Sequence, residues 1–186
     1  MKKLAIAAGV GLAGVALMAC GFLGGSKDSD SGSGAQYSDS RFGISVDLPG
    51  GWELVDEETD SDDMTTVDFS KGDLEVSLMY TPMEGLEELG LSEGEFLDMI
   101  MEEFAGSEGT SLQTVREGTI GVDGVAGKEK VIEGTIEGSQ GISRDIALFE
   151  NDKMVIILFI HEDADDFSSG DKKAMKEFLN GIELDL

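Results

Sequence analysis

Residues 153–160 have the sequence KMVIILFI, and this stretch decides the fold. It follows Asn151 and Asp152, a pair typical of a tight turn. A continuous apolar run of this length, bounded by a turn, is typical of a strand in the middle of a sheet. We therefore expect the chain to fold around a central strand at this point.

Further strands are predicted from a two-residue alternation of apolar and polar side chains. In RFGISVDLP, residues 41–49, the alternating apolar residues run from Phe42 to Leu48, and Pro49, Gly50 and Gly51 end the strand. Residues 64–70 and 73–80 form a predicted hairpin, joined at Lys71 and Gly72. Three more strands are expected at residues 112–122, 127–137 and 141–150. Glycines in these middle strands leave their register open.

Two helices are predicted between and after these strands. Ser92 and Glu95 form a capping-box pattern, and residues 96–104 then carry apolar side chains at helical spacing up to Gly106. The second helix begins near Ser168 or Ser169 and ends at Asn180 and Gly181. A short strand, residues 182–184, follows it. The apolar stripes of both helices are expected to face a sheet and form the core.

The stretch FGISVDLPGGWELV, residues 42–55, resembles the opening of PsbP- and Mog1-related domains, which include DcrB-like bacterial lipoproteins. The similarity rests on Leu48, Pro49, Gly51 and Trp52, and on the order of strands and helices over residues 41–186. It implies an α+β fold, an antiparallel β-sheet flanked by helices in an α/β/α sandwich. It implies no shared site, because a fold does not fix a function. Trp52 is expected to pack over the sheet edge, although a role in ligand stacking is the alternative.

Residues 1–19 have the anatomy of a lipoprotein signal peptide. Lys2 and Lys3 precede an uncharged stretch, and Leu17-Met18-Ala19-Cys20 resembles a lipobox, which predicts cleavage before Cys20 and acylation of its thiol with chains such as palmitate. The chain has one cysteine, which leaves it no internal disulfide partner. Residues 20–40 are predicted to be a flexible, acidic Gly/Ser tether. The alternative is an uncleaved anchor, since no charge occurs between residues 4 and 25.

Both alternatives place the domain on the extracytoplasmic face of the cell membrane, and in a Gram-negative cell the outer membrane is included. The formal net charge is −26 and the pI about 4.1, a field that repels nucleic acid. We expect no nucleic-acid partner. The expected partners are the membrane, through the lipid, and another envelope protein. The sequence does not specify the oligomeric state.

Motifs for catalysis are missing from the sequence. His161 is the one histidine, beside Glu162 and Asp163, and a Ser-His-Asp triad would have to use it. Neither a Gly-x-Ser-x-Gly elbow nor a phosphate-binding glycine motif occurs. The acidic stretch Asp56–Asp68 is the best calcium candidate, but its spacing lacks the EF-hand pattern. No catalytic residue, metal site or cofactor is assigned, and the binding residues stay unassigned.

The sequence therefore predicts a membrane-anchored extracytoplasmic lipoprotein with a non-enzymatic binding or accessory domain. A small-ligand or calcium-binding lipoprotein associated with a transporter is the alternative. A hydrolase that uses His161 is the third hypothesis.

Overall fold

The structure is a computed structural model that describes residues 35–59, 64–83, 111–136 and 139–186, together with Ser92, Glu95 and Met99. Contacts divide the chain into Met1–Ser33 and Gly34–Leu186, and the described residues all belong to the second unit. Cys20 and the predicted signal peptide lie outside the described residues. Within the described part of the chain, no helix has the length and apolar character that a membrane span requires.

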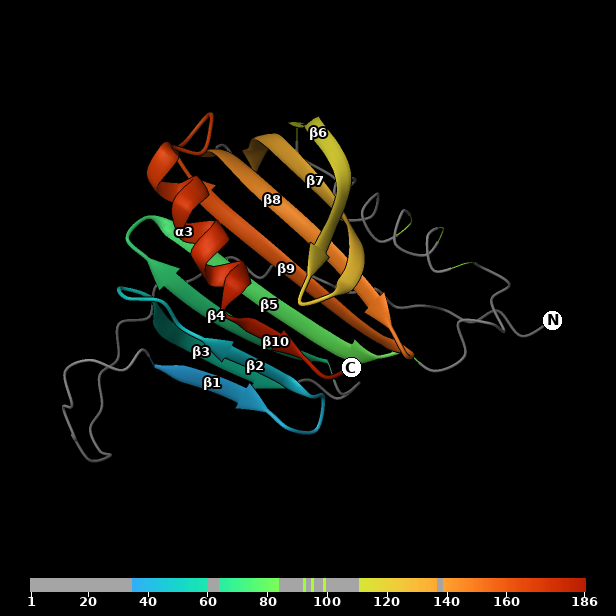
Figure 1. The fold of residues 1–186 in the computed structure, drawn as a ribbon. Helices are drawn as coiled ribbons and strands as arrows, with labels where there is room; N and C mark the ends of the chain where they lie inside the picture. Colours follow the sequence, from blue (N-terminus) through green and yellow to red (C-terminus); the bar gives the residue numbers. More distant parts are fainter. Residues whose placement is uncertain are drawn as a thin grey trace. The chain divides into compact units, whose positions relative to one another are not determined.

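The described residues form two antiparallel sheets and one helix of defined bounds (Figure 1). The larger sheet has seven strands in the order β3-β4-β5-β9-β8-β7-β6: β3 (Glu53–Thr59), β4 (Thr65–Lys71), β5 (Leu74–Pro82), β6 (Ser111–Val122), β7 (Val125–Ile136), β8 (Ser139–Glu150) and β9 (Lys153–Glu162). The smaller sheet has the order β1-β2-β10: β1 (Gln36–Asp39), β2 (Ile44–Asp47) and β10 (Ile182–Leu184). The helix is α3 (Ser169–Asn180).

The central strand predicted from KMVIILFI is confirmed, because β9 lies in the middle of the seven-stranded order. Successive side chains of a strand point to opposite faces of a sheet. Val155, Ile157 and Phe159 belong to the main core cluster, whereas Met154 and Ile156 belong to a second apolar cluster. The turn before β9 has positive φ at Asn151 and Asp152, the backbone that a two-residue hairpin turn requires.

The main core lies on the face of the large sheet that α3 and the small sheet cover (Figure 1). Phe178 of α3 is 0% exposed, and its ring centroid lies 4.8 Å from that of Trp52, 5.3 Å from that of Phe69 and 5.9 Å from that of Phe159. Trp52 is thus a core residue beneath the helix. The sequence predicted packing over the sheet edge, whereas the ring is buried in the main core against Phe178, and it is not available for stacking on a ligand.

The start and end of α3 agree with the sequence. Ser168 is the N-cap of a capping box, in which its hydroxyl accepts from the Asp171 amide and its own amide donates to the Asp171 carboxylate. At the other end, Gly181 passes so close to β2 that a Cβ would lie 2.2 Å from the Asp47 carbonyl oxygen, so only glycine fits. The Asp47 amide donates to the Gly181 carbonyl at 2.8 Å, which ties the end of the helix to the small sheet.

Three expectations need correction. The ordered sheet begins before residue 41, because β1 comprises Gln36–Asp39, which the sequence placed in the tether. The Tyr37 side chain ties β1 to the large sheet, because its hydroxyl forms a 2.6 Å hydrogen bond with that of Tyr80 on β5. The acidic stretch after Trp52 is not a loop but largely strand, with β3 paired to β4. The predicted α/β/α sandwich is matched only in part. On one face of the large sheet, α3 shares its layer with the small sheet, and among the described residues no second helix has defined bounds.

The helix predicted after Ser92 lies mostly outside the described residues. Its capping box is confirmed, because the Ser92 amide and hydroxyl both donate to the Glu95 carboxylate and the Glu95 amide donates to the Ser92 hydroxyl. Glu95 and Met99 are helical.

Replacing Phe178 with alanine tests the core beneath α3. Loss of a fully buried phenylalanine leaves a cavity, so Phe178→Ala should lower the free energy of unfolding by about 3–5 kcal/mol. Urea unfolding followed by circular dichroism measures it. The control is Lys173→Ala on the same helix, whose side chain is 77% exposed and whose change should stay within about 0.5 kcal/mol. Similar losses for both variants would contradict this assignment of the core.

Candidate functional site

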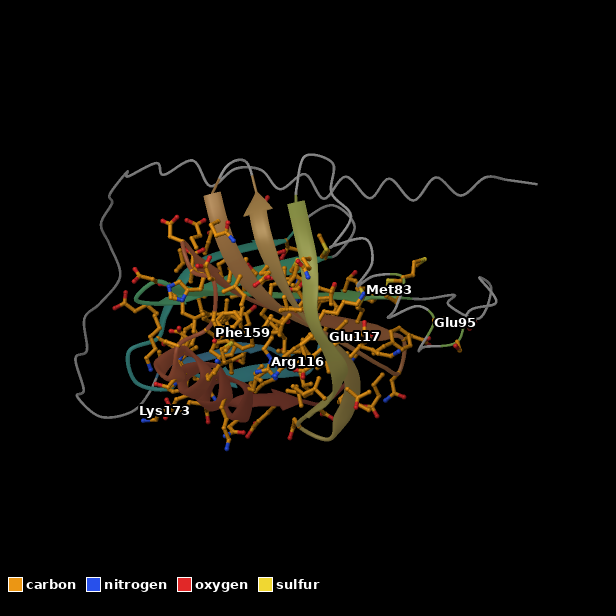
Figure 2. The ribbon with its side chains drawn as sticks, turned by 90° about the horizontal axis from the view of Figure 1, so that it is seen from above. Met83, Glu95, Arg116, Glu117, Phe159 and Lys173 are labelled. Atoms are coloured by element: carbon orange, nitrogen blue, oxygen red, sulfur yellow. The ribbon has the colours of Figure 1, made fainter. Side chains whose placement is uncertain are left out.

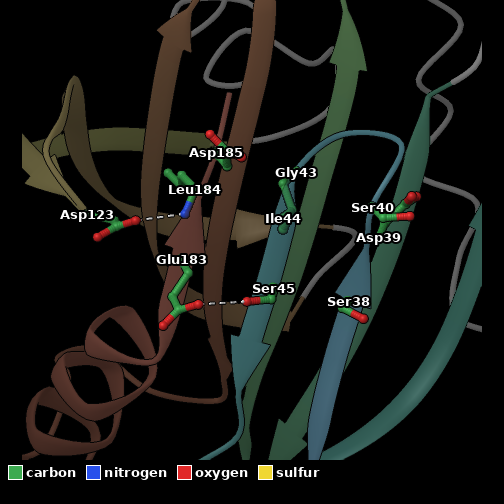
Figure 3. Close-up of a pocket in the computed structure, with 10 residues that line it drawn as sticks. All are labelled: Ser38, Asp39, Ser40, Gly43, Ile44, Ser45, Asp123, Glu183, Leu184 and Asp185. Carbon is green, nitrogen blue, oxygen red and sulfur yellow. Dashed lines mark hydrogen bonds between the residues drawn. The ribbon is translucent and has the colours of Figure 1, made fainter.

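Two hollows on the surface formed by the described residues are candidate sites. The smaller, of about 450 Å³, lies along the small sheet and is drawn in Figure 3. Four acids line it: Asp39, Asp123, Glu183 and Asp185. Three of these carboxylates already accept hydrogen bonds, including those from the Leu184 amide to Asp123 and from the Ser45 hydroxyl to Glu183. These bonds connect neighbouring chain segments, so the hollow is the weaker candidate.

The larger hollow is a cleft of about 740 Å³ between α3 and the β6–β8 half of the large sheet. We call it the α3–β6 cleft. Its volume falls in the range of small-molecule sites. The apolar part of its lining comes from both walls and from the segment before α3: Val115, Ile120, Val131, Ile142, Phe167, Met175 and Leu179.

The α3–β6 cleft exists because the sheet curls back toward the end of the helix. β6 and β7 are joined by a tight turn with positive φ at Asp123 and Gly124. The Leu184 amide of β10 donates to the Asp123 carboxylate at 2.8 Å. Since β10 directly follows α3, this bond joins the two walls at one end of the cleft.

A shared carboxylate organises the charged part of the lining. Arg144 on β8 donates from Nε and Nη2 to Oε2 of Glu129 on β7, at 3.0 and 2.6 Å. Arg116 on β6 places Nη2 3.5 Å from Oε1 of the same carboxylate. Arg144 and Glu129 are only 17% and 14% exposed, whereas Arg116 is 59% exposed. The Glu129 carboxylate thus contacts two guanidinium groups, and the guanidinium group of Arg116 keeps N–H donors that face solvent.

The helix adds further basic residues to the lining. Lys172 and Lys176 both line the cleft, and Lys172 pairs with Asp166 at 3.2 Å. Figure 2 shows Arg116 on the side of β6 toward α3, whereas Lys173 points away from the sheet on the outer side of the helix. The lining therefore combines an apolar floor with basic side chains from two strands, β6 and β8, and from α3.

His161 lies at the end of β9, next to the start of α3. Its Nδ1 is 3.3 Å from Oδ2 of Asp171, so its partner is not Glu162 or Asp163, the neighbours considered from the sequence. Burial raises the pKa of Asp171, but hydrogen bonds from Ser168 and the nearby imidazole lower it below its usual range. Ser168 uses its hydroxyl to accept from the Asp171 amide. Serine, histidine and acid are thus neighbours, but the serine caps the helix rather than bonding to the imidazole as in a triad.

The calcium candidate Asp56–Asp68 falls on two paired strands, with residues 60–63 outside the described ranges. Glu57 accepts from the Tyr37 hydroxyl at 3.1 Å, and Asp68 accepts from the Ser77 hydroxyl at 2.6 Å. The described residues contain no group of three potential ligands placed to hold a metal ion.

Sequence reasoning missed Arg116, Glu129 and Arg144. They occupy inward positions of three different strands, and their meeting depends on the β6–β7 and β7–β8 registers. The available signal was a charged residue at an otherwise apolar alternating position, as in Ile142-Ser143-Arg144.

The architecture is PsbP-like. No family model matches the chain, and no curated protein matches it. Among solved structures, cyanobacterial PsbP (CyanoP) from Synechocystis sp. PCC 6803 is similar with a TM-score of 0.54 and 17% identity, over 87% of this chain and 98% of that one. A chain from Bacteroides thetaiotaomicron has a TM-score of 0.52 and 11% identity, over 83% and 49%. LpqN, involved in cell envelope biogenesis of Mycobacterium tuberculosis, has a TM-score of 0.49 and 10% identity, over 82% and 85%.

These identities show the fold alone, so the similarity confirms the PsbP-like fold expected from residues 42–55 and leaves the function to be argued from the site.

A carboxyl group with a strongly raised pKa lies away from the cleft, on the other face of β8. Asp145 is 4% exposed, and burial raises its pKa to about 6, against the lowering effects of Ser143 and Lys130. The folded state therefore binds this proton more tightly than the unfolded chain does. The stabilising effect of that proton is complete below about pH 4 and is lost as the pH rises through about 6.

An Asp145→Asn variant should consequently be more stable than the parent at pH 7.5, by at most about 3 kcal/mol, because two pKa units correspond to about that free energy. The gain should shrink toward zero near pH 4. Thermal unfolding between pH 4 and 8 measures it, with the exposed Asp166→Asn as the control. A gain that is independent of pH would contradict the assignment.

Proposed function

We propose that this chain is a lipid-anchored, extracytoplasmic binding protein without enzymatic activity, and that the α3–β6 cleft is its binding site. The single observation that supports the binding role is the cleft itself, which places the Glu129, Arg116 and Arg144 cluster beside an apolar floor. Most specific sites are concave and largely apolar, with a few fixed polar groups, and this lining has that composition.

The anchor is supported by the sequence Leu17-Met18-Ala19-Cys20, which resembles a lipobox. The proposed location is the extracytoplasmic face of the cell membrane, with acyl chains on Cys20 holding the domain there. An envelope protein is the proposed partner to which the domain delivers or presents its ligand.

The absence of enzymatic activity is supported by local geometry. A triad needs the nucleophile hydroxyl on the histidine. Here the His161 ring contacts Asp171, and the Ser168 hydroxyl accepts from the helix backbone.

The alternative function is a lipoprotein that binds either a small ligand or calcium. Of these two ligands, the cleft favours the small organic one. Calcium prefers six to eight oxygen ligands, largely carboxylates and carbonyls. The cleft instead offers guanidinium and ammonium donors, with Glu129 already held by two arginines.

Lipidation is tested by intact mass and membrane partitioning after expression of the full chain in a bacterium. The parent should lose residues 1–19, gain a lipid-sized mass and partition with membranes. Cys20→Ala should abolish the cleavage and the lipid-sized mass, because the thiol is the acylation site, whereas Ser26→Ala should abolish neither. A parent chain that keeps residues 1–19 and stays in the membrane without the added mass would replace the lipid with a spanning anchor, and a parent chain that remains in the cytoplasm would refute the proposed location.

A further inference from the structure

Apolar side chains of the α3–β6 cleft lie at its closed end and also near the start of α3, where Phe167 belongs to the lining. Ile120 lies four residues beyond Arg116, toward the Asp123 turn that joins β10. Leu179 is in the last turn of α3, next to the same junction. The closed end is therefore apolar, and the basic residues lie between it and the start of the helix, where Lys172 pairs with Asp166.

We propose that the cleft binds a single-chain amphiphile with an anionic head group, of the class of fatty acids and lysophospholipids. The inference rests on the proposed binding function and specifies its ligand. The acyl chain enters the closed end along Ile120, Leu179 and the buried Val131, and the head group binds Arg116 and Lys176. Burial of apolar surface favours binding of the acyl chain, and charge-assisted hydrogen bonds hold the head group.

Charge complementarity supports an anion rather than a cation. Residues 35–186 contain 10 Lys/Arg against 37 Asp/Glu, and four of those 10 basic residues line this cleft. The four acids in the lining, which include Glu133 and Asp165, make it neutral where the domain as a whole is strongly negative. An anion is repelled elsewhere on the domain and meets the least repulsion here.

The donors needed for an anion are also accessible. Glu129 is occupied by two guanidinium groups, so a single negative charge faces two positive ones. Arg116 is 59% exposed and touches Glu129 at only 3.5 Å, so several of its five N–H donors point to solvent. Lys176 is an exposed residue of the same lining.

A peptide strand added to β6 is less favoured, although β6 is an edge of the sheet. The β6–β7 register shifts between Thr114 and Arg116, which leaves Val115 as a bulge with 46% exposure. A bulge interrupts the row of backbone groups that an added strand needs.

The test uses residues 20–186 with Cys20→Ser, which keeps the whole compact unit and removes the anchor, so its outcome is independent of the lipidation experiment. Dansyl-labelled undecanoate is the probe. Saturable fluorescence enhancement is expected, with displacement by oleate and by oleoyl lysophosphatidylglycerol. Neutral monoolein, which has the same chain, and butyrate, which has the same carboxylate, should displace the probe at least about tenfold less well.

Variants locate the site within the cleft. Arg116→Gln with Lys176→Gln should weaken oleate binding by about tenfold or more and abolish the preference over monoolein, because each removes a charged donor. Lys173→Gln is the matched control, on the outer face of α3 and 77% exposed, and should change nothing. Ile120→Trp narrows the closed end. It should weaken the binding of long-chain ligands without changing the circular dichroism spectrum.

Three outcomes would overturn the proposal: no saturable binding of the probe, equal displacement by oleate and monoolein, or unchanged affinity in both the charge variant and Ile120→Trp. A variant that does not fold is replaced by Arg116→Lys, which keeps a charge and should retain most of the affinity. None of these outcomes affects the assignment of Cys20 as the anchor.

Discussion

The packing of the Phe178 ring against Trp52, Phe69 and Phe159 is the interaction on which the rest of the domain depends. These rings come from α3, the segment after β2, β4 and β9, so a single fully buried side chain joins both layers. Aromatic groups of this size contribute strongly to a core through buried area and edge contacts. The position of α3 over the β4–β9 half of the large sheet follows from this cluster.

The cleft is a consequence of that placement. A helix 12 residues long covers only part of a seven-stranded sheet, and α3 is committed to the half near Trp52. The inward face of β6, β7 and β8 then has no helix directly over it within the described residues. It is partly closed by curvature instead, because the Asp123 turn bonds to the Leu184 amide of β10. A hollow with an apolar floor remains between the helix and the curled strands.

Elements encoded by neighbouring residues were predictable from the sequence, and those created by distant pairing were not. β9, α3, β10 and the β4–β5 hairpin each have a complete local signal of period, cap or turn. β3 has none, because it is an edge strand whose seven residues are all exposed, four of them acidic. β1 is specified by the contact between Tyr37 and Tyr80, which are 43 residues apart. The Arg116, Glu129 and Arg144 cluster likewise requires two strand registers that glycines obscure.

The arginine cluster would also form the proposed binding surface before a ligand arrives. Arg116 on β6 and Arg144 on β8 flank β7, and their guanidinium groups would repel one another without an acid between them. Glu129 on β7 contacts both. The carboxylate orients Arg144, which is nearly buried, and leaves Arg116 projecting into the cleft. Because the Glu129–Arg144 ion pair already positions Arg116, less conformational entropy would be lost when an anion binds to Arg116. In a domain with 37 acids, the same pairing occupies the inner arginine, and the outer arginine remains as a donor for the proposed anionic ligand.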